Sequence, residues 1–293
     1  MKKIFFAAVF LATNFFANFV SASDDALISV FSEDVKFAES VLPYDSGIFV
    51  SNFGSDELEP RKDENKGYIF YRKDGINKKI VEGLHKPTAM KVKDNFLFVC
   101  DETVLKIFDL KNLSAKPKII SFAPEDKVVN ALALDENNYL YISITDSGKI
   151  YKLDVSDVKN LKNPELWLKI SGPNGLNIGE GVMYIATIPP DYKTVTSEFV
   201  IYCVKDLKKP VAEKFIDIPG LYDGVALSKD FKTLYATNWA TGSLTAIDIK
   251  TKKFRTIYAE KGIGPCDIAY SEGKIILPEI IGSKIISINV EKF

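Results

Sequence analysis

The chain has 293 residues, of which 46% are hydrophobic and 26% charged, and its formal net charge at pH 7 is −1. This composition is typical of a globular protein with a full hydrophobic core, and it excludes a disordered or collagen-like chain. A near-neutral chain offers no strongly basic surface, and neither a G-x-x-x-x-G-K-[ST] loop nor a strand-G-x-G-x-x-G-helix unit is present. We therefore expect neither nucleic acid nor a nucleotide as a partner.

The N-terminus has the features of an export signal. Two lysines at positions 2 and 3 precede the apolar run IFFAAVFLATNFF, and small residues follow at positions 20 to 22. The alternative is a transmembrane anchor, but Asn14 and Asn18 interrupt a stretch that is already short for spanning a bilayer. We predict a cleaved signal over residues 1–22, a single domain over residues 23–293, a periplasmic or secreted location, and no stable membrane anchor after cleavage.

The rest of the chain consists of expected strands in a repeat of about 45 residues. One strand, residues 26–33, stands alone before the repeat begins. Each of six units then has a short apolar strand, a turn rich in Asp, Asn, Gly or Lys, and a second strand ending FVS, FVC, YIS, YIA, YAT or ILP. Third strands are expected at 66–73, 103–110, 148–155, 198–205, 242–249 and 283–290. Fourth strands are recognisable at 116–123, 164–171, 212–219 and 254–261.

This period predicts an all-β protein folded as a six-bladed β-propeller, with one four-stranded blade per unit. The sixth unit ends after its third strand, so we expect the N-terminal strand 26–33 to pair with the strand at 284–290 and complete that blade. This closure would remove two exposed strand edges. An up-and-down barrel is the alternative, and it would explain the alternating strands but not the period.

One position repeats at the start of the first strand of every unit. It is occupied by Glu39, Thr88, Asn130, Asn174, Asp223 and Cys266, with gaps of 49, 42, 44, 49 and 43 residues. In a propeller these strands line the central channel, so their first residues converge near the axis. Two carboxylates and two amide oxygens would then face one small volume, where the two anions would repel each other unless a cation lay between them. Hard oxygen donors suit Ca²⁺, or Mg²⁺ and Mn²⁺. The alternative is that these polar groups only cap loops.

The chain resembles the SMP-30/gluconolactonase/LRE family of calcium-dependent lactonases, which is related at the level of the fold to paraoxonases and strictosidine synthase-like propellers. The resemblance rests on Glu39, on Asn174 in the Asn174-Gly175-Leu176 segment, on Asp223 in the Asp223-Gly224-Val225 segment, and on Asn130. It implies that Glu39, Asn174 and Asp223 hold a divalent metal, Ca²⁺ first, with Mn²⁺, Mg²⁺ or Zn²⁺ as alternatives. It also implies that Asp223 acts as general base and that Asn130 orients the substrate, a lactone or ester.

The chain departs from that family at three places. Ser40 and Val41 follow Glu39 where the family usually has Gly-Pro, and Ala131 follows Asn130. Val128 stands where sugar lactonases can carry a substrate-binding arginine. Without that charge, we expect less polar lactones or esters to be better substrates than sugar acids.

The loops between second and third strands should share the channel mouth with this repeated position. They contribute the expected substrate-binding residues Asn52, Asp146, Asn238, Trp239 and Glu279. Two insertions, 54–66 and 188–198, are candidate lids. Because propellers host unrelated functions, the second hypothesis is a non-catalytic exported propeller that binds a protein, glycan or small ligand.

The remaining reactive residue types give little support to other mechanisms. Three cysteines, an odd number, leave at least one free thiol, and Cys100 and Cys203 lie in strand-like apolar runs. His85 is the sole histidine, in the loop-like GLHKP, and no G-x-S-x-G nucleophile elbow accompanies it. We therefore expect neither a disulfide framework nor a serine-histidine mechanism.

Overall fold

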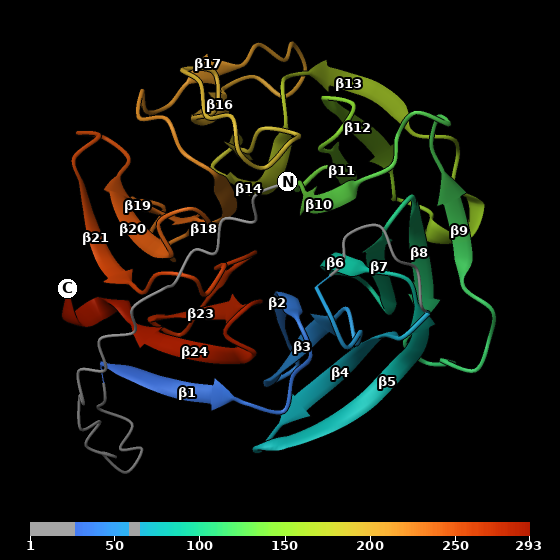
Figure 1. The fold of residues 1–293 in the computed structure, drawn as a ribbon. Helices are drawn as coiled ribbons and strands as arrows, with labels where there is room; N and C mark the ends of the chain where they lie inside the picture. Colours follow the sequence, from blue (N-terminus) through green and yellow to red (C-terminus); the bar gives the residue numbers. More distant parts are fainter. Residues whose placement is uncertain (1–26, 59–64) are drawn as a thin grey trace, which may run out of the picture.

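The computed structural model describes residues 27–58 and 65–293. The predicted signal, residues 1–22, lies outside these ranges, as does part of the first candidate lid. Within the described ranges the chain forms six four-stranded antiparallel sheets. The sheets are arranged radially around a central axis, which confirms the predicted six-bladed β-propeller (Figure 1).

The strands follow the chain from the axis outward in each of the first five blades. Blade 1 comprises β2 (Ala38–Tyr44), β3 (Gly47–Asn52), β4 (Gly67–Lys73) and β5 (Ile76–Leu84), and blade 2 comprises β6 (Pro87–Lys93), β7 (Phe96–Asp101), β8 (Val104–Asp109) and β9 (Lys118–Ser121). Blade 3 comprises β10 (Val129–Leu134), β11 (Tyr139–Ile144), β12 (Lys149–Asp154) and β13 (Glu165–Lys169). Blade 4 comprises β14 (Pro173–Gly179), β15 (Val182–Thr187), β16 (Ile201–Val204) and β17 (Glu213–Lys214), and blade 5 comprises β18 (Tyr222–Leu227), β19 (Thr233–Asn238), β20 (Ser243–Asp248) and β21 (Phe254–Ala259).

Blade 6 joins the two ends of the described chain, as the sequence predicts. Its strands are β22 (Ala269–Ser271), β23 (Lys274–Glu279), β24 (Lys284–Asn289) and β1 (Ile28–Ser32). β1 pairs antiparallel with β24, Ile28 opposite Ile288 and Val30 opposite Ile286. The outer edge of β24 is therefore covered by a strand from the other end of the described chain, and the ring is closed.

Tight turns between consecutive strands of a blade explain the clusters of Asp, Asn and Gly in the sequence. The two-residue connections Asp45-Ser46, Asp74-Gly75, Glu180-Gly181 and Glu272-Gly273 all have positive φ at both positions. This is the conformation of a type I′ turn, whose twist matches that of the flanking strands. Glycine adopts it without the steric cost that other residues incur, which accounts for its place as the second residue of three of these turns.

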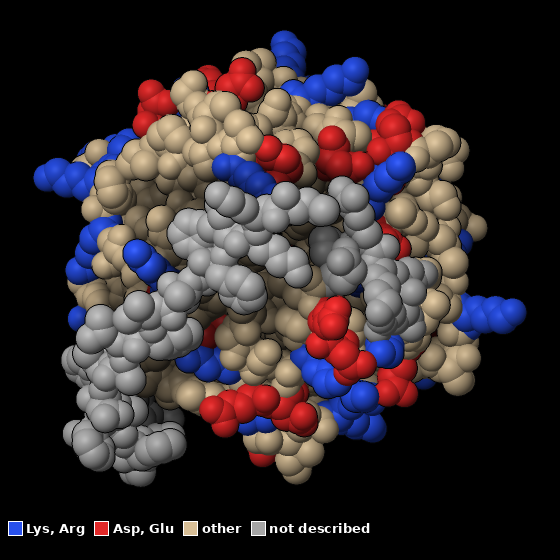
Figure 2. All heavy atoms as spheres, viewed as in Figure 1, with Lys and Arg blue, Asp and Glu red and all other residues tan. Residues whose placement is uncertain are grey.

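The hydrophobic core lies between neighbouring blades. The largest cluster includes Phe98, Leu140, Ile142 and Ile150, and it joins side chains of blades 2, 3 and 4. On the face shown in Figure 2, acidic and basic side chains are interspersed around the rim, and neither sign forms an extended patch. No helix in residues 27–58 or 65–293 has the length and hydrophobicity needed to cross a membrane.

Candidate metal centre

The six innermost strands form a closed ring, and their first residues lie at one end of the channel. Hydrogen bonds tie neighbouring strands together at this end. The Thr88 hydroxyl donates to the Asn130 carbonyl oxygen over 2.7 Å, and the Asp267 backbone N–H donates to the Glu39 carbonyl oxygen over 3.1 Å. The second of these bonds joins blade 6 to blade 1, so the ring of starting residues is continuous.

A β-bulge lies at this repeated position in five of the six blades. The register between first and second strands shifts at Glu39, Thr88, Asn130, Asn174 and Asp223. A bulged residue is released from the ladder and its side chain is redirected. This explains how polar residues that are normally depleted from strands are accommodated here.

Hydroxyl groups of the second strands accept hydrogen bonds from backbone N–H groups that the bulges leave without a partner in the strand ladder. The N–H groups of Ser40, Ala131 and Gly224 donate to the hydroxyls of Ser51, Ser143 and Thr237 over 3.0, 2.9 and 2.7 Å. These hydroxyls are the last residues of the FVS, YIS and YAT segments. The recurring hydroxyl at the end of these segments is a sequence signal of this second role, beyond the strands that the segments predict.

Two of these hydroxyls also bond the next blade. Ser143 donates to the Asn174 carbonyl oxygen over 2.9 Å, and Thr237 donates to the Cys266 carbonyl oxygen over 3.0 Å. Each of these two side chains therefore fixes two adjacent inner strands relative to each other, whereas Ser51 donates to the Ser40 carbonyl oxygen of its own blade. In blade 2 a cysteine takes this position, and Thr88 itself supplies the bond to blade 3.

Glycines let the inner strands of blades 4, 5 and 6 approach closely. A Cβ at Gly175 would lie 2.3 Å from the Asp223 carbonyl oxygen, and one at Gly224 would lie 2.7 Å from the Cys266 carbonyl oxygen. Only glycine fits at such distances. The N-G and D-G pairs of the sequence thus bring Asn174, Asp223 and Cys266 together on adjacent strands.

Three of the repeated side chains form a compact cluster. One carboxylate oxygen each of Glu39 and Asp223 and the sulfur of Cys266 all lie within 4.8 Å of one another. These residues start blades 1, 5 and 6, which are consecutive around the closed ring. All three side chains are buried, with exposed fractions of 5%, 7% and 3%.

The two carboxylates lack a protein partner for one oxygen each. Within the described ranges, Glu39 Oε2 and Asp223 Oδ1 are buried without a hydrogen-bond partner. Burial, and then the neighbouring Asp267 carboxylate, raises the pKa of Asp223 to about 8. Burial, and then the charges of Asp223 and Asp267, raises the pKa of Glu39 well above its usual value. Because desolvated carboxylates without partners are costly, this donor set fits a divalent cation.

Asp267 is a third carboxylate next to this cluster, and it was not among the site residues predicted from the sequence. Its side chain accepts from the Ser40 hydroxyl over 3.1 Å and from the Ile268 N–H over 3.1 Å. Burial raises its pKa to about 6, and the nearby Lys91 opposes that rise. The positive charge of Lys91 therefore partly offsets the negative charge of Asp267, while the carboxylates of Glu39 and Asp223 still repel each other.

The two predicted asparagines lie at the bulges of their strands. Asn174 is the second residue of β14 and is 2% exposed, and Asn130 is the second residue of β10 and is 8% exposed. Both carbonyl oxygens accept the inter-blade hydroxyl bonds described above. The structure therefore holds all four predicted polar residues at the same end of the inner ring.

Four of the predicted substrate-binding residues have hydrogen-bond partners within the protein. Asn52 Oδ1 accepts from the Lys36 N–H, Asp146 accepts from the N–H groups of residues 127 and 128, and Asn238 Oδ1 accepts from the Ala240 N–H. Glu279 accepts from the Tyr258 hydroxyl over 2.8 Å and pairs with Lys284. These contacts are typical of loop caps.

Two aromatic residues lie nearer the cluster. Trp239 is half-buried, a Cβ on Gly264 would lie 2.8 Å from its Nε1, and its indole lies beside the Cys266 thiol, where it opposes the rise that burial causes in the pKa of that thiol. Tyr192, in the insertion 188–198, was not selected from the sequence. Burial, followed by the charges of Asp223 and Glu39, raises its pKa to about 12, although 42% of the residue is exposed. An aromatic residue inside a candidate lid was the signal that could have identified it.

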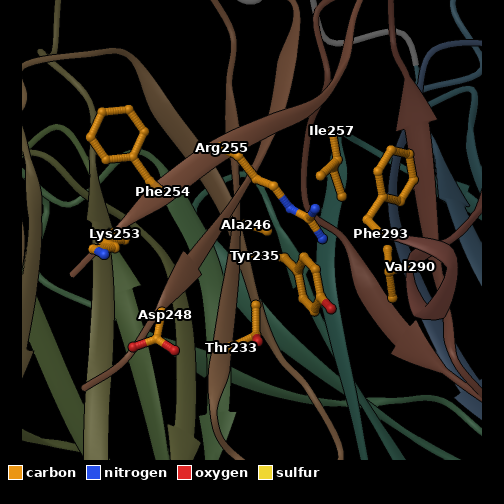
Figure 3. Close-up of a pocket in the computed structure, with 10 residues that line it drawn as sticks. All are labelled: Thr233, Tyr235, Ala246, Asp248, Lys253, Phe254, Arg255, Ile257, Val290 and Phe293. Atoms are coloured by element: carbon orange, nitrogen blue, oxygen red, sulfur yellow. The ribbon is translucent and has the colours of Figure 1, made fainter. Parts of the chain in front are cut away.

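A separate groove is lined by strands of blade 5 and by Val290 and Phe293 near the C-terminus (Figure 3). No residue of the repeated position lines it. It has a volume of about 430 Å³, and Arg255 lies between Tyr235 and Phe293, with its Cζ 5.5 Å from the Phe293 ring centre. None of the buried unpartnered atoms in the described part of the chain belongs to it. The chemistry of the inner ring therefore makes the ring the better candidate site.

Comparison with known proteins does not assign the chain to a family. No protein-family model matches it, and no curated protein matches it in sequence.

Proposed function

We propose that the protein is an exported metal-dependent hydrolase that opens a lactone or a related ester, as enzymes of the SMP-30/gluconolactonase type do. One observation carries the proposal. The buried carboxylates of Glu39 and Asp223 meet at the start of the inner strands, and within the described ranges each keeps an unpartnered oxygen. Asp101 and Glu279 also have a buried oxygen without a hydrogen bond, but those oxygens form ion pairs with Lys106 and Lys284. No lysine or arginine of the described ranges pairs with Glu39 or Asp223 in this way.

Glu39, Asn174 and Asp223 would hold the cation, and Asn130 lies on the adjoining inner strand. A divalent cation bound there would polarise a carbonyl oxygen of the substrate and lower the pKa of a water molecule. The chain supplies the exclusion of bulk water, because the carboxylates are buried, and it fixes their positions through the bulges and the inter-blade hydroxyl bonds.

Asp223 is the proposed general base. Its free Oδ1 can accept a proton from the attacking water while the water oxygen bonds to the carbonyl carbon. The bond from that carbon to the ring oxygen then breaks, and the proton passes to the departing oxygen, which gives a hydroxy acid. In the metal-free protein, burial raises the pKa of Asp223 to about 8, so the carboxyl group is largely protonated near neutral pH. The charge of a bound cation would lower this pKa again, and the ionised carboxylate could then take the proton.

Three further residues bear on the substrate. Asn130 would orient the carbonyl group, and Tyr192 would contact the substrate from the insertion at the mouth. Val128 is half-buried two residues before Asn130 and carries no charge, which favours less polar lactones and esters.

A panel of lactones and aryl esters tests the proposal, assayed in chelator and with added Ca²⁺, Mn²⁺ or Zn²⁺. We expect turnover that depends on the metal and falls by roughly 10²- to 10⁴-fold in Asp223→Asn, the usual cost of losing a general base. Asp217→Asn is the matched control, because Asp217 is exposed and forms an ion pair with the surface Lys214. If no substrate shows metal-dependent turnover, the hydrolase proposal is wrong and the hypothesis of a non-catalytic binding propeller takes its place.

A further inference from the structure

The metal centre contains a sulfur atom that a calcium site does not require. The Cys266 sulfur lies within 4.8 Å of carboxylate oxygens of both Glu39 and Asp223. We infer that Cys266 is a further ligand of this centre, and that its thiolate makes the site select Zn²⁺ or a similarly thiophilic cation over Ca²⁺. The inference rests on the metal centre proposed above and concerns which cation it takes.

The sulfur is held in place from two sides. In the thiol form Sγ donates to the Gly264 carbonyl oxygen over 3.4 Å, a bond that the thiolate would exchange for its bond to the cation, and the Trp239 indole lies beside the sulfur. The indole also lies against the Gly264 backbone, where a side chain would not fit. A ligand oriented by neighbouring groups in this way is typical of metal sites.

The alternative is that Cys266 is a small apolar residue filling a gap, as buried cysteines often are. That explanation does not account for its surroundings, because its neighbours in the cluster are two buried carboxylates whose Oε2 and Oδ1 atoms have no partner in the described chain. Cys100 and Cys203 are equally buried, yet neither belongs to such a cluster within the described residues.

Ligand chemistry decides which cation fits. Ca²⁺ and Mg²⁺ take oxygen ligands, whereas Zn²⁺ accepts thiolate together with carboxylate and leaves a position open in catalytic sites. Binding would convert the thiol to a thiolate and release its proton to solvent. Two carboxylates and one thiolate give three anionic ligands, and the asparagine oxygens remain for the cation's other positions.

Cadmium is the spectroscopic probe, since it resembles zinc and gives an ultraviolet charge-transfer band when bound by thiolate. Chelator-stripped protein should develop this band with one equivalent of Cd²⁺. Cys100→Ser and Cys203→Ser are the matched controls and should keep the band, whereas Cys266→Ser should lose it. Absence of the band from the unmodified protein would overturn the inference, whether or not the variants fold.

Calorimetry gives the second measurement. The unmodified protein should bind Zn²⁺ more tightly than Ca²⁺, and Cys266→Ser should lose at least the roughly 10- to 100-fold in Zn²⁺ affinity that removing a supporting group costs. In a Trp167→Phe background, fluorescence comes from Trp239 alone and should change on Zn²⁺ binding, because its indole contacts the sulfur. Equal Zn²⁺ affinity in Cys266→Ser and the unmodified protein would refute the assignment.

The outcomes separate the two proposals. Tight Ca²⁺ binding without a cadmium band would refute the sulfur ligand and leave the oxygen-ligated hydrolase standing. A cadmium band without metal-dependent hydrolysis would support the sulfur ligand and refute the hydrolase.

Discussion

Replacing Asp223 with asparagine should stabilise the metal-free protein above about pH 5, although it removes a residue of the proposed site. The carboxylate is 7% exposed, one of its oxygens has no partner in the described chain, and its pKa is raised to about 8 by burial and then by Asp267. Asparagine has nearly the same shape as the protonated acid and never takes a charge.

The size of the effect follows from proton linkage. The pKa of an unfolded aspartate is about 3.9. Between that value and about 8, the native state keeps a proton on Asp223 that the unfolded state has lost, so the contribution of this group to stability falls as the pH rises. The slope is about 1.4 kcal/mol per pH unit, which amounts to about 3 kcal/mol between about pH 5 and 7. Loss of the charge beside Glu39 acts in the same direction.

Urea denaturation in chelator, repeated across this pH range, measures the difference between the two proteins. The free energy of unfolding of the unmodified protein should decline relative to Asp223→Asn as the pH rises. With excess Zn²⁺ or Ca²⁺ the order should reverse, because only the unmodified site binds the ion fully. Asp217→Asn should show no such trend. A difference that does not vary with pH in chelator would mean that Asp223 is ionised throughout, and it would refute the reasoning.

Two further predictions concern the scaffold of the site. Thr237→Val should lower the free energy of unfolding by about 1 to 3 kcal/mol, because the buried Gly224 N–H loses its acceptor. Thermal or urea denaturation measures this change. An unchanged midpoint would show that the bulge does not need the hydroxyl. Gly175→Ala should cost about 1 to 3 kcal/mol through overpacking and should weaken metal binding, since its Cβ would overlap the Asp223 carbonyl oxygen. Gly181→Ala is its control, with open space but a positive φ, and should leave metal binding intact.

The sequence alone determined the number of blades and the closure of the ring. Alternating strands with turn residues recur every 45 residues or so, and a strand pattern is a local property of side-chain order. The unpaired strand at residues 26–33 and the incomplete last unit could each be recognised from that count. The structure confirms their pairing through β1 and β24.

The predicted strand lengths were less accurate, because the residue at which a strand ends depends on its pairing with the strands beside it. The strand expected at 212–219 is only Glu213–Lys214, the short outer edge of blade 4. In blade 6 the first strand begins at Ala269, after an isolated bridge at Pro265, which has no backbone N–H to donate.

The candidate site was likewise predictable from the sequence only in part. Glu39, Asn130, Asn174 and Asp223 could be identified because they occupy the same position in successive repeat units. Equivalent positions of a propeller converge on its axis. The repeat also contained Cys266, but nothing in the sequence indicated that its sulfur lies within 4.8 Å of two carboxylates. That proximity depends on the close approach of strands at Gly175 and Gly224 and on bulges that redirect side chains.

Asp267 was recognisable only in three dimensions. Asp267 follows Cys266 in the chain, yet its importance comes from the charges of Glu39 and Asp223, which belong to other blades. Electrostatic interactions depend on distance through space, and residues more than 200 positions apart in the sequence become neighbours when the ring closes, as the hydrogen bond from Ser40 to Asp267 shows.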